Sequence, residues 1–397
     1  MIAYRTKPTA PFRRALPMAV TALSAALLLA SCSDADSTSS QTSSGTPVAG
    51  SSTPAVDGQV RVTELMTGLD HPWDVAIDRA GNVVTGERGG RIVVRHNDGR
   101  VAEVSADTSD VRARGEGGLM ALTLATDFDT SRTVYTCAAS SAGDVRVVRW
   151  SAAADWSSMR QTGTVLTGIP LGESGRHSGC RILPAPDGTL YVSTGDTADP
   201  TAPQDLANLG GKVLHIDADG RPASGTFPGT PVHSLGHRNP QGLAFAPGTD
   251  RLYTTEHGPT VDDELNLERP QANYGWDPNT GSGSYDENVP MTDETRHPGS
   301  VPAVWSSGDP TLAVADLEFL GPSWREYNGM IAVAALKAQR LVLLRLDGAG
   351  TSTTERVDLL QGSQGRLRSI TTAPDGSLLI TTDNGDDKDK VLRVSLA

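Results

Sequence analysis

Short apolar runs of four to six residues, joined in pairs by a turn of the Pro-Asp-Gly kind, recur along this chain. The clear copies are WDVAIDRAGNVVTGER from Trp73, CRILPAPDGTLYVSTGD from Cys180, GLAFAPGTDRLYTTEHG from Gly242 and LRSITTAPDGSLLITTDNG from Leu367. Two looser copies begin at Gly118 and Asp316. A turn of this kind between two apolar runs predicts an antiparallel β-hairpin.

The six turns fall near residues 81, 130, 188, 249, 326 and 376, at steps of about 49, 58, 61, 77 and 50. Hardly any amphipathic helix pattern lies between them, and irregular repeats of this length are typical of radial β-architectures. We therefore predict an all-β fold, a single six-bladed β-propeller of four-stranded antiparallel blades over residues 59–397. The alternative is a pair of β-sandwiches, which accounts poorly for one phrase repeated along the whole chain.

Composition narrows the class of protein without changing this picture. Gly and Pro make up about 17% of the 397 residues, too little for a disordered or collagen-like chain. Hydrophobic residues, at 37%, can fill a sizeable core at this length. The formal net charge of -13 argues against nucleic acid as a partner, because phosphate binding needs a basic surface.

The N-terminus has the pattern of an export signal. Four basic residues precede an apolar run over residues 15–30, which ends in Leu-Ala-Ser-Cys at Cys32. This predicts a signal peptide over residues 1–31. The ending resembles a bacterial lipobox, in which the Cys is lipidated and becomes the new N-terminus. The alternative is an ordinary signal peptide followed by an incidental Cys.

A flexible tether is predicted over residues 32–58, where residues 33–58 contain eight Ser and four Thr without hydrophobic periodicity. Cleavage after residue 31 would leave 30 Lys and Arg against 47 Asp and Glu, a formal charge of -17. Such a surface repels anionic lipid, so only the lipid on Cys32 would hold the protein to the membrane. We expect a monomer on the extracytoplasmic face of the cell membrane.

Two further cysteines remain, Cys137 and Cys180. An exported domain permits a disulfide between them. Two buried free thiols explain the same residues equally well, and the sequence leaves both alternatives open.

Polar residues that could carry chemistry flank the repeated strands. In a propeller, the loops at one end of the inner strands converge on the central channel, so residues distant in sequence can meet there. The candidates are Glu116, Arg176, His177, Asp196, Arg238, Asn239, His257, Glu264, Lys337, Arg366 and Arg368. Several cations beside a His that can move protons suit an anionic ligand or cofactor.

These residues lie in segments that resemble the soluble PQQ-dependent glucose/aldose (sorbosone-type) sugar dehydrogenase family. The segments are LDHPWDVAI, GEGGLMALTLATDFD, RHSGCRILPAPDGTLYVSTGD, GGKVLHIDADG, GHRNPQGLAF, EHGPTVDDELNLERPQANYGW, ALKAQRL and GRLRSITTAPDG. They follow the order of the family and span nearly all of residues 60–397. The resemblance implies a six-bladed propeller with PQQ over the channel and bound calcium.

The resemblance also implies the chemistry. His177 would be the general base that takes the proton of the anomeric hydroxyl of an aldose, while hydride passes from the anomeric carbon to PQQ and a lactone forms. Asp196 would orient His177 and stabilise its charged form, as a carboxylate does for an imidazole base. The electrons would then leave to an external acceptor.

The remaining roles follow from the same resemblance. Glu116, Arg238 and Asn239 would contact PQQ, the latter two at the quinone oxygen where negative charge develops. Lys337, Arg366 and Arg368 would bind its three carboxylates; the two Arg side chains share one face of a strand because they are two residues apart.

Calcium is expected in the stretch from Glu256 to Trp276. The carbonyls of Gly258 and Pro259 would hold the ion that also binds PQQ, and Glu264 with the carbonyl of Tyr274 would form a second, structural site. The acidic segment over residues 383–389 also looks like a calcium loop, but its spacing fits none, and we interpret it as a solvated turn.

Three residues depart from the glucose-oxidising members: Glu116 and His257 stand where those have Gln, and Arg176 where they have an acid. All three lie on the substrate side, so a preference for glucose does not carry over. Two other functions compete with the dehydrogenase. A calcium-dependent lactone hydrolase would have no use for the carboxylate-binding cations, and a non-catalytic binding propeller would not need His177.

Overall fold

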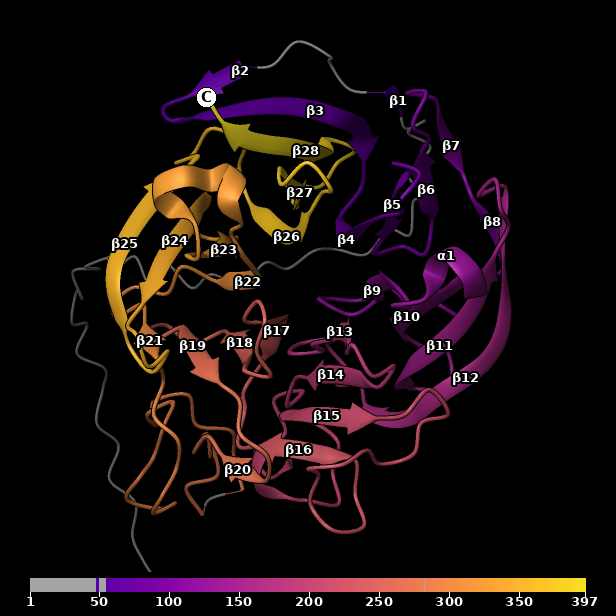
Figure 1. Cartoon of the computed structure of the whole chain (residues 1–397). Helices are drawn as coiled ribbons and strands as arrows, with labels where there is room; N and C mark the ends of the chain where they lie inside the picture. Colours follow the sequence, from indigo (N-terminus) through magenta and orange to yellow (C-terminus); the bar gives the residue numbers. More distant parts are fainter. Residues whose placement is uncertain (1–47, 50–54, 282) are drawn as a thin grey trace, which may run out of the picture. The chain divides into compact units, whose positions relative to one another are not determined.

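The propeller is built from six mainly antiparallel sheets arranged around a central channel (Figure 1). The structure is a computed structural model, and it describes residues 48–49, 55–281 and 283–397. The first strand of each blade is innermost, and each blade lies beside the next through these first strands.

Blades 1 to 3 follow one another along the chain. The strands of blade 1 are β4 (Pro72–Ile77), β5 (Val83–Glu87), β6 (Ile92–Arg95) and β7 (Val101–Glu103). The strands of blade 2 are β9 (Leu119–Leu124), β10 (Thr133–Ala139), β11 (Asp144–Ala152), β12 (Ser158–Pro170) and the short β8 (Ser105–Ala106). The strands of blade 3 are β13 (Arg181–Pro184), β14 (Leu190–Thr194), β15 (Lys212–Ile216), β16 (Val232–Leu235) and the short β20 (Ala272–Asn273).

Blades 4 to 6 complete the ring. The strands of blade 4 are β17 (Pro240–Phe245), β18 (Leu252–Glu256), β19 (Glu264–Leu267) and β21 (Trp305–Ser306). The strands of blade 5 are β22 (Val314–Phe319), β23 (Ile331–Ala335), β24 (Arg340–Leu346) and β25 (Thr353–Leu359). The strands of blade 6 are β26 (Leu367–Thr372), β27 (Leu378–Thr382), β28 (Asp389–Leu396) and β3 (Val60–Leu69).

The predicted six-bladed architecture is confirmed, and so are the six predicted turns. Each turn joins the first and second strands of one blade. The looser turns contain short helices, α1 (Phe128–Ser131) in blade 2 and the 3-10 helix η2 (Pro322–Tyr327) in blade 5. The 3-10 helix η1 (Ala202–Gln204) lies between β14 and β15. No helix among the described residues is long and apolar enough to cross a membrane.

Blade 6 is closed by strands from both ends of the described chain. β3 pairs antiparallel with β28, so that Val60 lies opposite Leu396. Two short strands, β1 (Val48–Ala49) and β2 (Ala55–Asp57), also pair with β3, although both fall in the segment predicted as tether. The predicted signal peptide, the predicted lipidation site Cys32 and residues 33–47 and 50–54 of the tether lie outside the described residues.

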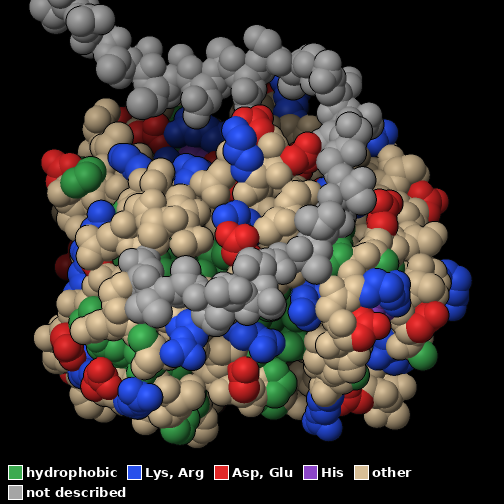
Figure 2. Space-filling model, turned by 90° about the horizontal axis from the view of Figure 1, so that it is seen from above, with side chains coloured by type: hydrophobic (Ala, Val, Ile, Leu, Met, Phe, Trp, Pro, Cys, Tyr) green, Lys and Arg blue, Asp and Glu red, His purple; other side chains and the backbone are tan. Residues whose placement is uncertain are grey.

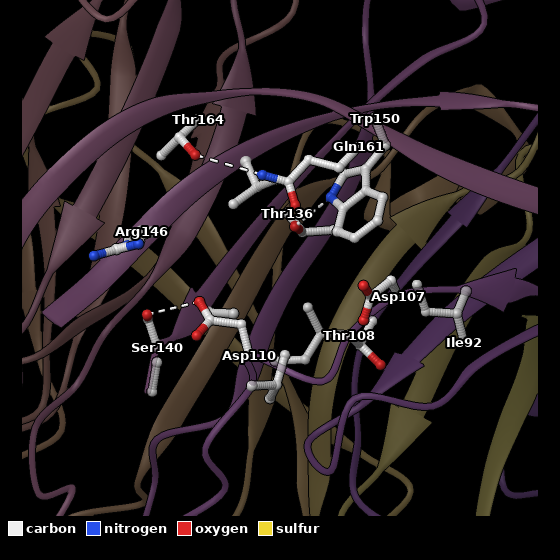
Figure 3. A pocket seen from close by; sticks show the side chains of 15 residues that line it. Ile92, Asp107, Thr108, Asp110, Thr136, Ser140, Arg146, Trp150, Gln161 and Thr164 are labelled. Carbon is white, nitrogen blue, oxygen red and sulfur yellow. Dashed lines mark hydrogen bonds between the residues drawn. The ribbon is translucent and has the colours of Figure 1, made fainter. Parts of the chain in front are cut away.

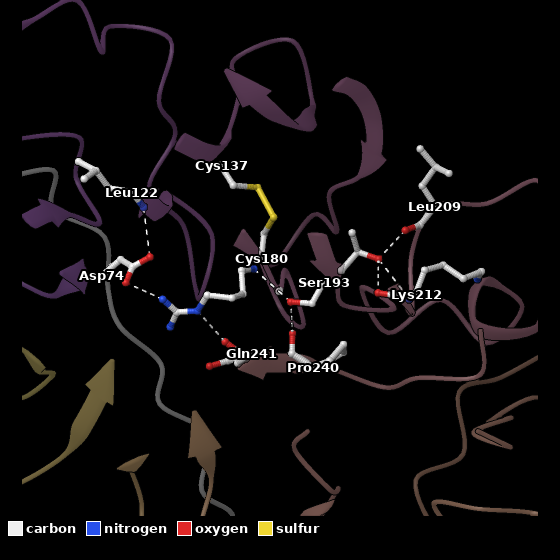
Figure 4. The surroundings of a disulfide bond; sticks show 12 residues. Asp74, Leu122, Cys137, Cys180, Ser193, Leu209, Lys212, Pro240 and Gln241 are labelled. Atoms are coloured by element: carbon white, nitrogen blue, oxygen red, sulfur yellow. Dashed lines mark hydrogen bonds and ion pairs between the residues drawn. A yellow bond between two sulfur atoms is a disulfide. The ribbon is translucent and has the colours of Figure 1, made fainter. Parts of the chain in front are cut away.

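Cys137 and Cys180 form a disulfide with a Cα–Cα distance of 6.3 Å (Figure 4). Cys137 lies in β10 of blade 2, and Cys180 precedes β13 of blade 3. Both are buried in the apolar cluster between these blades. Of the two alternatives left open by the sequence, the structure therefore shows the disulfide, and it covalently joins neighbouring blades three residues from His177.

Arg181 lies at the centre of the channel and is 6% exposed. Its guanidinium contacts the carboxylates of Asp74 in β4 at 2.6 Å and Asp316 in β22 at 3.1 Å. Its Nε donates to the carbonyl of Gln241 in β17. Asp74 also accepts from the backbone of Leu122 in β9, a bond drawn in Figure 4.

A backbone N–H of β26 completes this set of contacts by donating to Asp316. The innermost strands of all six blades therefore contribute to one buried polar network around Arg181. Burial raises the pKa of Asp316, and the nearby carboxylate of Asp74 adds to the rise, against the effect of Arg181.

Acidic and basic side chains are interspersed on the face seen in Figure 2. They do not gather there into one basic patch. This agrees with the acidic composition.

Candidate active site

Most of the predicted site residues lie at one end of the channel. They occupy loops that precede the first strand of a blade or follow its second strand, and these loops share one end of the propeller. His177 precedes β13, Asp196 follows β14, and Arg238 and Asn239 precede β17. The repeat therefore gathers residues from distant parts of the chain.

His177 and Asp196 form a buried hydrogen-bonded pair. Nδ1 of His177 lies 2.7 Å from Oδ1 of Asp196, and the residues are 3% and 0% exposed. Since the carboxylate can only accept, Nδ1 carries the proton and Nε2 keeps its lone pair. Nε2 accepts a hydrogen bond from Nε of Arg176 at 3.2 Å. This is the geometry of an oriented imidazole base.

Two further side chains bind the second carboxylate oxygen of Asp196. Trp276 donates from Nε1 at 2.8 Å and Tyr285 donates from its hydroxyl at 2.5 Å. Burial raises the pKa of Tyr285, and the carboxylate of Asp196 adds to the rise, so the phenol remains a donor. These hydrogen bonds therefore hold the Asp196 carboxylate in place behind His177.

Lys212 binds the backbone of the segment that follows Asp196. Its ammonium, fully buried, donates to the backbone carbonyls of Ala202, Pro203 and Gly210. Burial lowers the pKa of Lys212 to about 7. This cation ties down the segment that follows Asp196.

Arg238 and Asn239 face the channel from the loop before β17. Asn239 donates from Nδ2 to Glu116 at 3.0 Å and accepts from the backbone N–H of Gly179. Arg238 donates to the carbonyl of His257 at 3.0 Å. Burial would raise the pKa of Glu116, but nearby His177, His257 and Arg368 together with the bond from Asn239 lower it.

Arg176 and Arg238 share a carboxylate that the sequence did not indicate. Glu287 contacts both guanidiniums, that of Arg238 at 2.6 Å. Burial opposes ionisation of Glu287, but the two cations hold its pKa at about 2. Glu287 and Tyr285 thus bring the long loop between β20 and β21 onto the substrate side of the site.

Arg366, just before β26, and Arg368, within it, both lie beside the carboxylate of Asp383, a partner that the sequence analysis did not predict. Arg368 contacts Oδ2 of Asp383 at 2.6 Å, and Arg366 lies 3.6 Å from the same atom. Lys337 is exposed and donates to Thr311 at 3.3 Å. No contact between Lys337 and the two Arg residues is found in the described part of the chain.

The interpretation of residues 383–389 as a solvated turn is wrong in part. Asp383 is 5% exposed and accepts from His71 and Arg368, and Asp389 is fully buried. Asp386 and Lys388, between them, are exposed as predicted. Asp383 and Asp389 are buried because they lie at the ends of strands β27 and β28, and the polar composition of the segment does not show this.

The predicted metal loop after β18 is tightly turned. A Cβ built on Gly258 would lie 2.0 Å from the carbonyl oxygen of Val261, so only glycine fits there. Asp263 fixes the loop by accepting from the backbone N–H of Gly258 at 3.0 Å, and burial raises the pKa of Asp263 to about 6. Pro259 lies within this turn and is partly exposed.

Glu264 lies opposite Glu256 across strands β19 and β18, and both are buried. Burial raises the pKa of Glu264, and the carboxylate of Glu256 adds to the rise. Carboxylate oxygens are the ligands that calcium takes in proteins, so the chemistry of this pair suits a cation. The side chain of Tyr274 points elsewhere, with its hydroxyl bonded to the carbonyl of Leu267 at 2.6 Å.

The sequence carried only partial signals for the residues that it missed. Glu287 and Tyr285 stand in a loop without periodicity, so nothing local indicated their partners. Asp383 follows the repeated strand phrase one position earlier than Asp196 does, and this near correspondence could have identified it.

Comparisons with known proteins agree with this fold. A model of the glucose/sorbosone dehydrogenase family matches residues 69–393. An aldose sugar dehydrogenase of Escherichia coli strain K12 is 30% identical over 362 residues, which cover 86% of this chain and 94% of the relative.

Two solved structures are also similar. The PQQ-bound aldose sugar dehydrogenase of Streptomyces coelicolor has 31% identity and a TM-score of 0.69, and the match covers 86% of this chain and all of that chain. A putative oxidoreductase (glucose dehydrogenase) of Thermus thermophilus has 36% identity and a TM-score of 0.70, covering 84% and 99%. With its family model matched over most of the sequence, this chain belongs to the glucose/sorbosone dehydrogenase family.

Proposed function

We propose that this protein is a PQQ- and calcium-dependent aldose dehydrogenase that oxidises the anomeric carbon of a sugar to a lactone. One observation supports this most directly. A buried imidazole, that of His177, is oriented by the carboxylate of Asp196 and accepts from the guanidinium of Arg176 at Nε2. Proton abstraction beside a bound polyanion is the chemistry for which this arrangement is suited.

The residues present fit PQQ. Nε of Arg238, Nε of Arg368 and Nε2 of His257 are all buried without a hydrogen-bond partner. Buried polar atoms are nearly always satisfied, so these three are appropriate for a polar ligand rather than for an empty channel. Burial lowers the pKa of His257 to about 3, and Arg238 and Arg368 add to this, so its ring is neutral.

PQQ, when bound, would supply the hydride acceptor. The chain's own residues do the rest. Nε2 of His177 takes the proton of the anomeric hydroxyl, and Asp196 stabilises the imidazolium that results. Trp276 and Tyr285 keep that carboxylate in place through their two hydrogen bonds.

Cationic groups would hold the cofactor. Arg238 and Asn239 would donate to the quinone oxygen, and Arg366, Arg368 and Lys337 would bind the carboxylates. Glu287 must release Arg238 if that guanidinium is to turn toward a bound ligand. Calcium would be held by the Gly258–Pro259 turn.

Membership in the family also guides the remaining proposals. The substrate is an aldose, since the relatives from Escherichia coli and Streptomyces coelicolor are named aldose sugar dehydrogenases. The protein works as an exported monomer, anchored by the lipid on Cys32 to the extracytoplasmic face of the membrane, and passes electrons to an external acceptor.

The decisive experiment is dye-linked oxidation of a panel of sugars by the purified apo-protein, with PQQ, calcium, both or neither. We expect activity only when both are supplied. Activity that depends on neither would overturn the proposal, and hydrolysis of a lactone with calcium alone would favour the hydrolase.

A further inference from the structure

Several cavities lie away from the proposed active site among the described residues, and a small one in blade 2 and a larger one between blades 3 and 4 differ in their capacity for a ligand. The smaller, inside blade 2, has a volume of about 60 Å³ (Figure 3). Its polar side chains already have partners, Ser140 with Asp110 at 2.7 Å and Trp150 with Thr136 at 2.8 Å. This cavity is too small for a ligand, and these side chains already have hydrogen-bond partners.

The larger cavity, of about 860 Å³, lies between blades 3 and 4 at the end of the propeller opposite to His177. β14 starts beside it, with Tyr191 as its second residue, and leads to Asp196. β16 has His233 as its second residue and leads to Arg238. The same strands therefore have this cavity at one end and the proposed active site at the other.

Four aromatic rings from four strands line the cavity. The rings of Tyr191 and His215 are stacked, with centroids 4.0 Å apart and an angle of 8° between planes. His233 and Phe245 meet the ring of Tyr191 edge-on, at 5.2 and 5.7 Å. A cluster of this kind offers ring faces and edges to a flat or cationic ligand.

One ring nitrogen in this cluster has no partner. His215 is fixed by contacts of Nδ1 with the carbonyl of Ser224 at 2.9 Å and of Nε2 with the hydroxyl of Thr189 at 2.8 Å. His233 is 4% exposed, and its Nδ1 is buried without a hydrogen bond. A Cβ built on Gly225, in the cavity wall, would lie 4.0 Å from this atom, so Nδ1 lies beside this wall, which His233 itself also lines.

The charge of the cavity is negative. Asp187 and Asp250 line it, and no Lys or Arg does so among the described residues. Burial raises the pKa of Tyr191, and both carboxylates add to the rise, so they lie close enough to act on the rings. Burial is the main reason that the pKa of His233 is lowered to about 4, so this ring is neutral and can accept a hydrogen bond.

We propose that this cavity binds a small organic cation, a protonated amine with an aromatic or apolar body. The rings of Tyr191 and Phe245 would contact the body, and Nδ1 of His233 would accept an N–H of the ammonium. Asp187 and Asp250 would supply the opposite charge. A volume of this size accommodates an amine of one or two rings.

Calorimetric titration of the purified protein with 2-phenylethylamine tests the proposal, with 2-phenylethanol, 3-phenylpropanoate and glucose as comparison ligands. The amine should bind, and its neutral and anionic analogues should bind at least about tenfold more weakly, because two partly exposed ion pairs together reach about that factor. The double variant Asp187→Asn/Asp250→Asn should lose the preference for the amine. His233→Phe, which keeps a ring in place, should also weaken binding of the amine.

Asp375→Asn is the matched control. Asp375 accepts from the backbone N–H of Ser377 at 3.0 Å, as Asp187 accepts from that of Thr189 at 3.0 Å, but it lies outside the cavity. This variant should bind the amine as the parent does. Equal binding of amine and alcohol, or a preference unchanged by the double variant, would overturn the proposal. So would binding of glucose without the amine, which would indicate a sugar site.

Discussion

Replacement of Arg181 by Met should destabilise the protein more than any other single change in the channel that we consider. The side chain is lost from between two carboxylates that are 5% and 3% exposed, those of Asp74 and Asp316. Removing one partner from a buried ionic network costs about 3–5 kcal/mol, because the remaining charge stays buried and unpaired. We therefore expect the free energy of unfolding to fall by about 4 kcal/mol at neutral pH.

The same variant should show a distinct pH dependence. Arg181 opposes the rise in the pKa of Asp316, so without the guanidinium this folded-state pKa rises further above its unfolded value. A raised folded-state pKa gives stability that is present at low pH and lost as pH rises. The deficit of the variant relative to the parent should therefore grow between pH 5 and pH 8 and shrink on acidification.

Denaturant unfolding followed by circular dichroism measures these effects. Arg149→Met is the control, since the side chain is 35% exposed and lies 3.8 Å from Asp219, which is 57% exposed. Such a pair contributes at most about 1 kcal/mol. If Arg181→Met were as mild as this control, the network would not hold the blades together, and the reasoning would be refuted.

Three further predictions concern the site, the disulfide and the cavity. His177→Ala should lower turnover by about 10² or more with PQQ still bound, and Asp196→Asn should lower it by disturbing the orientation of the imidazole; parental turnover in His177→Ala would exclude that base. Thiol titration of the denatured, unreduced protein should find neither Cys137 nor Cys180 free. Reduction should lower the free energy of unfolding by about 4 kcal/mol, because the bond closes a loop with a sequence separation of 43 residues. An unchanged melting temperature after reduction would contradict this. The pKa of His233 is about 4 in the folded protein and 6.5 in the unfolded chain, so between pH 6.5 and pH 4 only the unfolded state gains a proton, and about 3 kcal/mol of stability is lost. His233→Phe should lack this loss. Equal acid sensitivity of parent and variant would contradict the prediction.

The sequence predicted the architecture well because the signal for it is local. Each hairpin contains its own turn, and each turn joins the first, innermost strand of a blade to the second. The gathering of His177, Asp196 and Arg238 followed from the same repeat, since strand ends at one side of a propeller converge.

What escaped prediction depends on contacts between distant segments. Arg181 stands in an otherwise apolar strand, and nothing near it indicates that its partners come from blades 1 and 5. Glu287 reaches Arg176 over 111 residues, from a loop without pattern. Asp383 was interpreted from its polar neighbours in sequence, whereas its burial is decided by His71 at a separation of 312 residues.

The pairing of β3 with β28 has a consequence for how the molecule is made. In a chain synthesised from its N-terminus, β3 is made long before β28, the strand that completes its sheet. Until then β3 has an open edge, of the kind that pairs with other chains. The ring can close only once β28 has been made, when the backbone N–H of Ala397 meets the carbonyl of Gln59 at 3.0 Å. Loss of residues 389–396 would therefore leave blades 1 to 5 complete and the ring open.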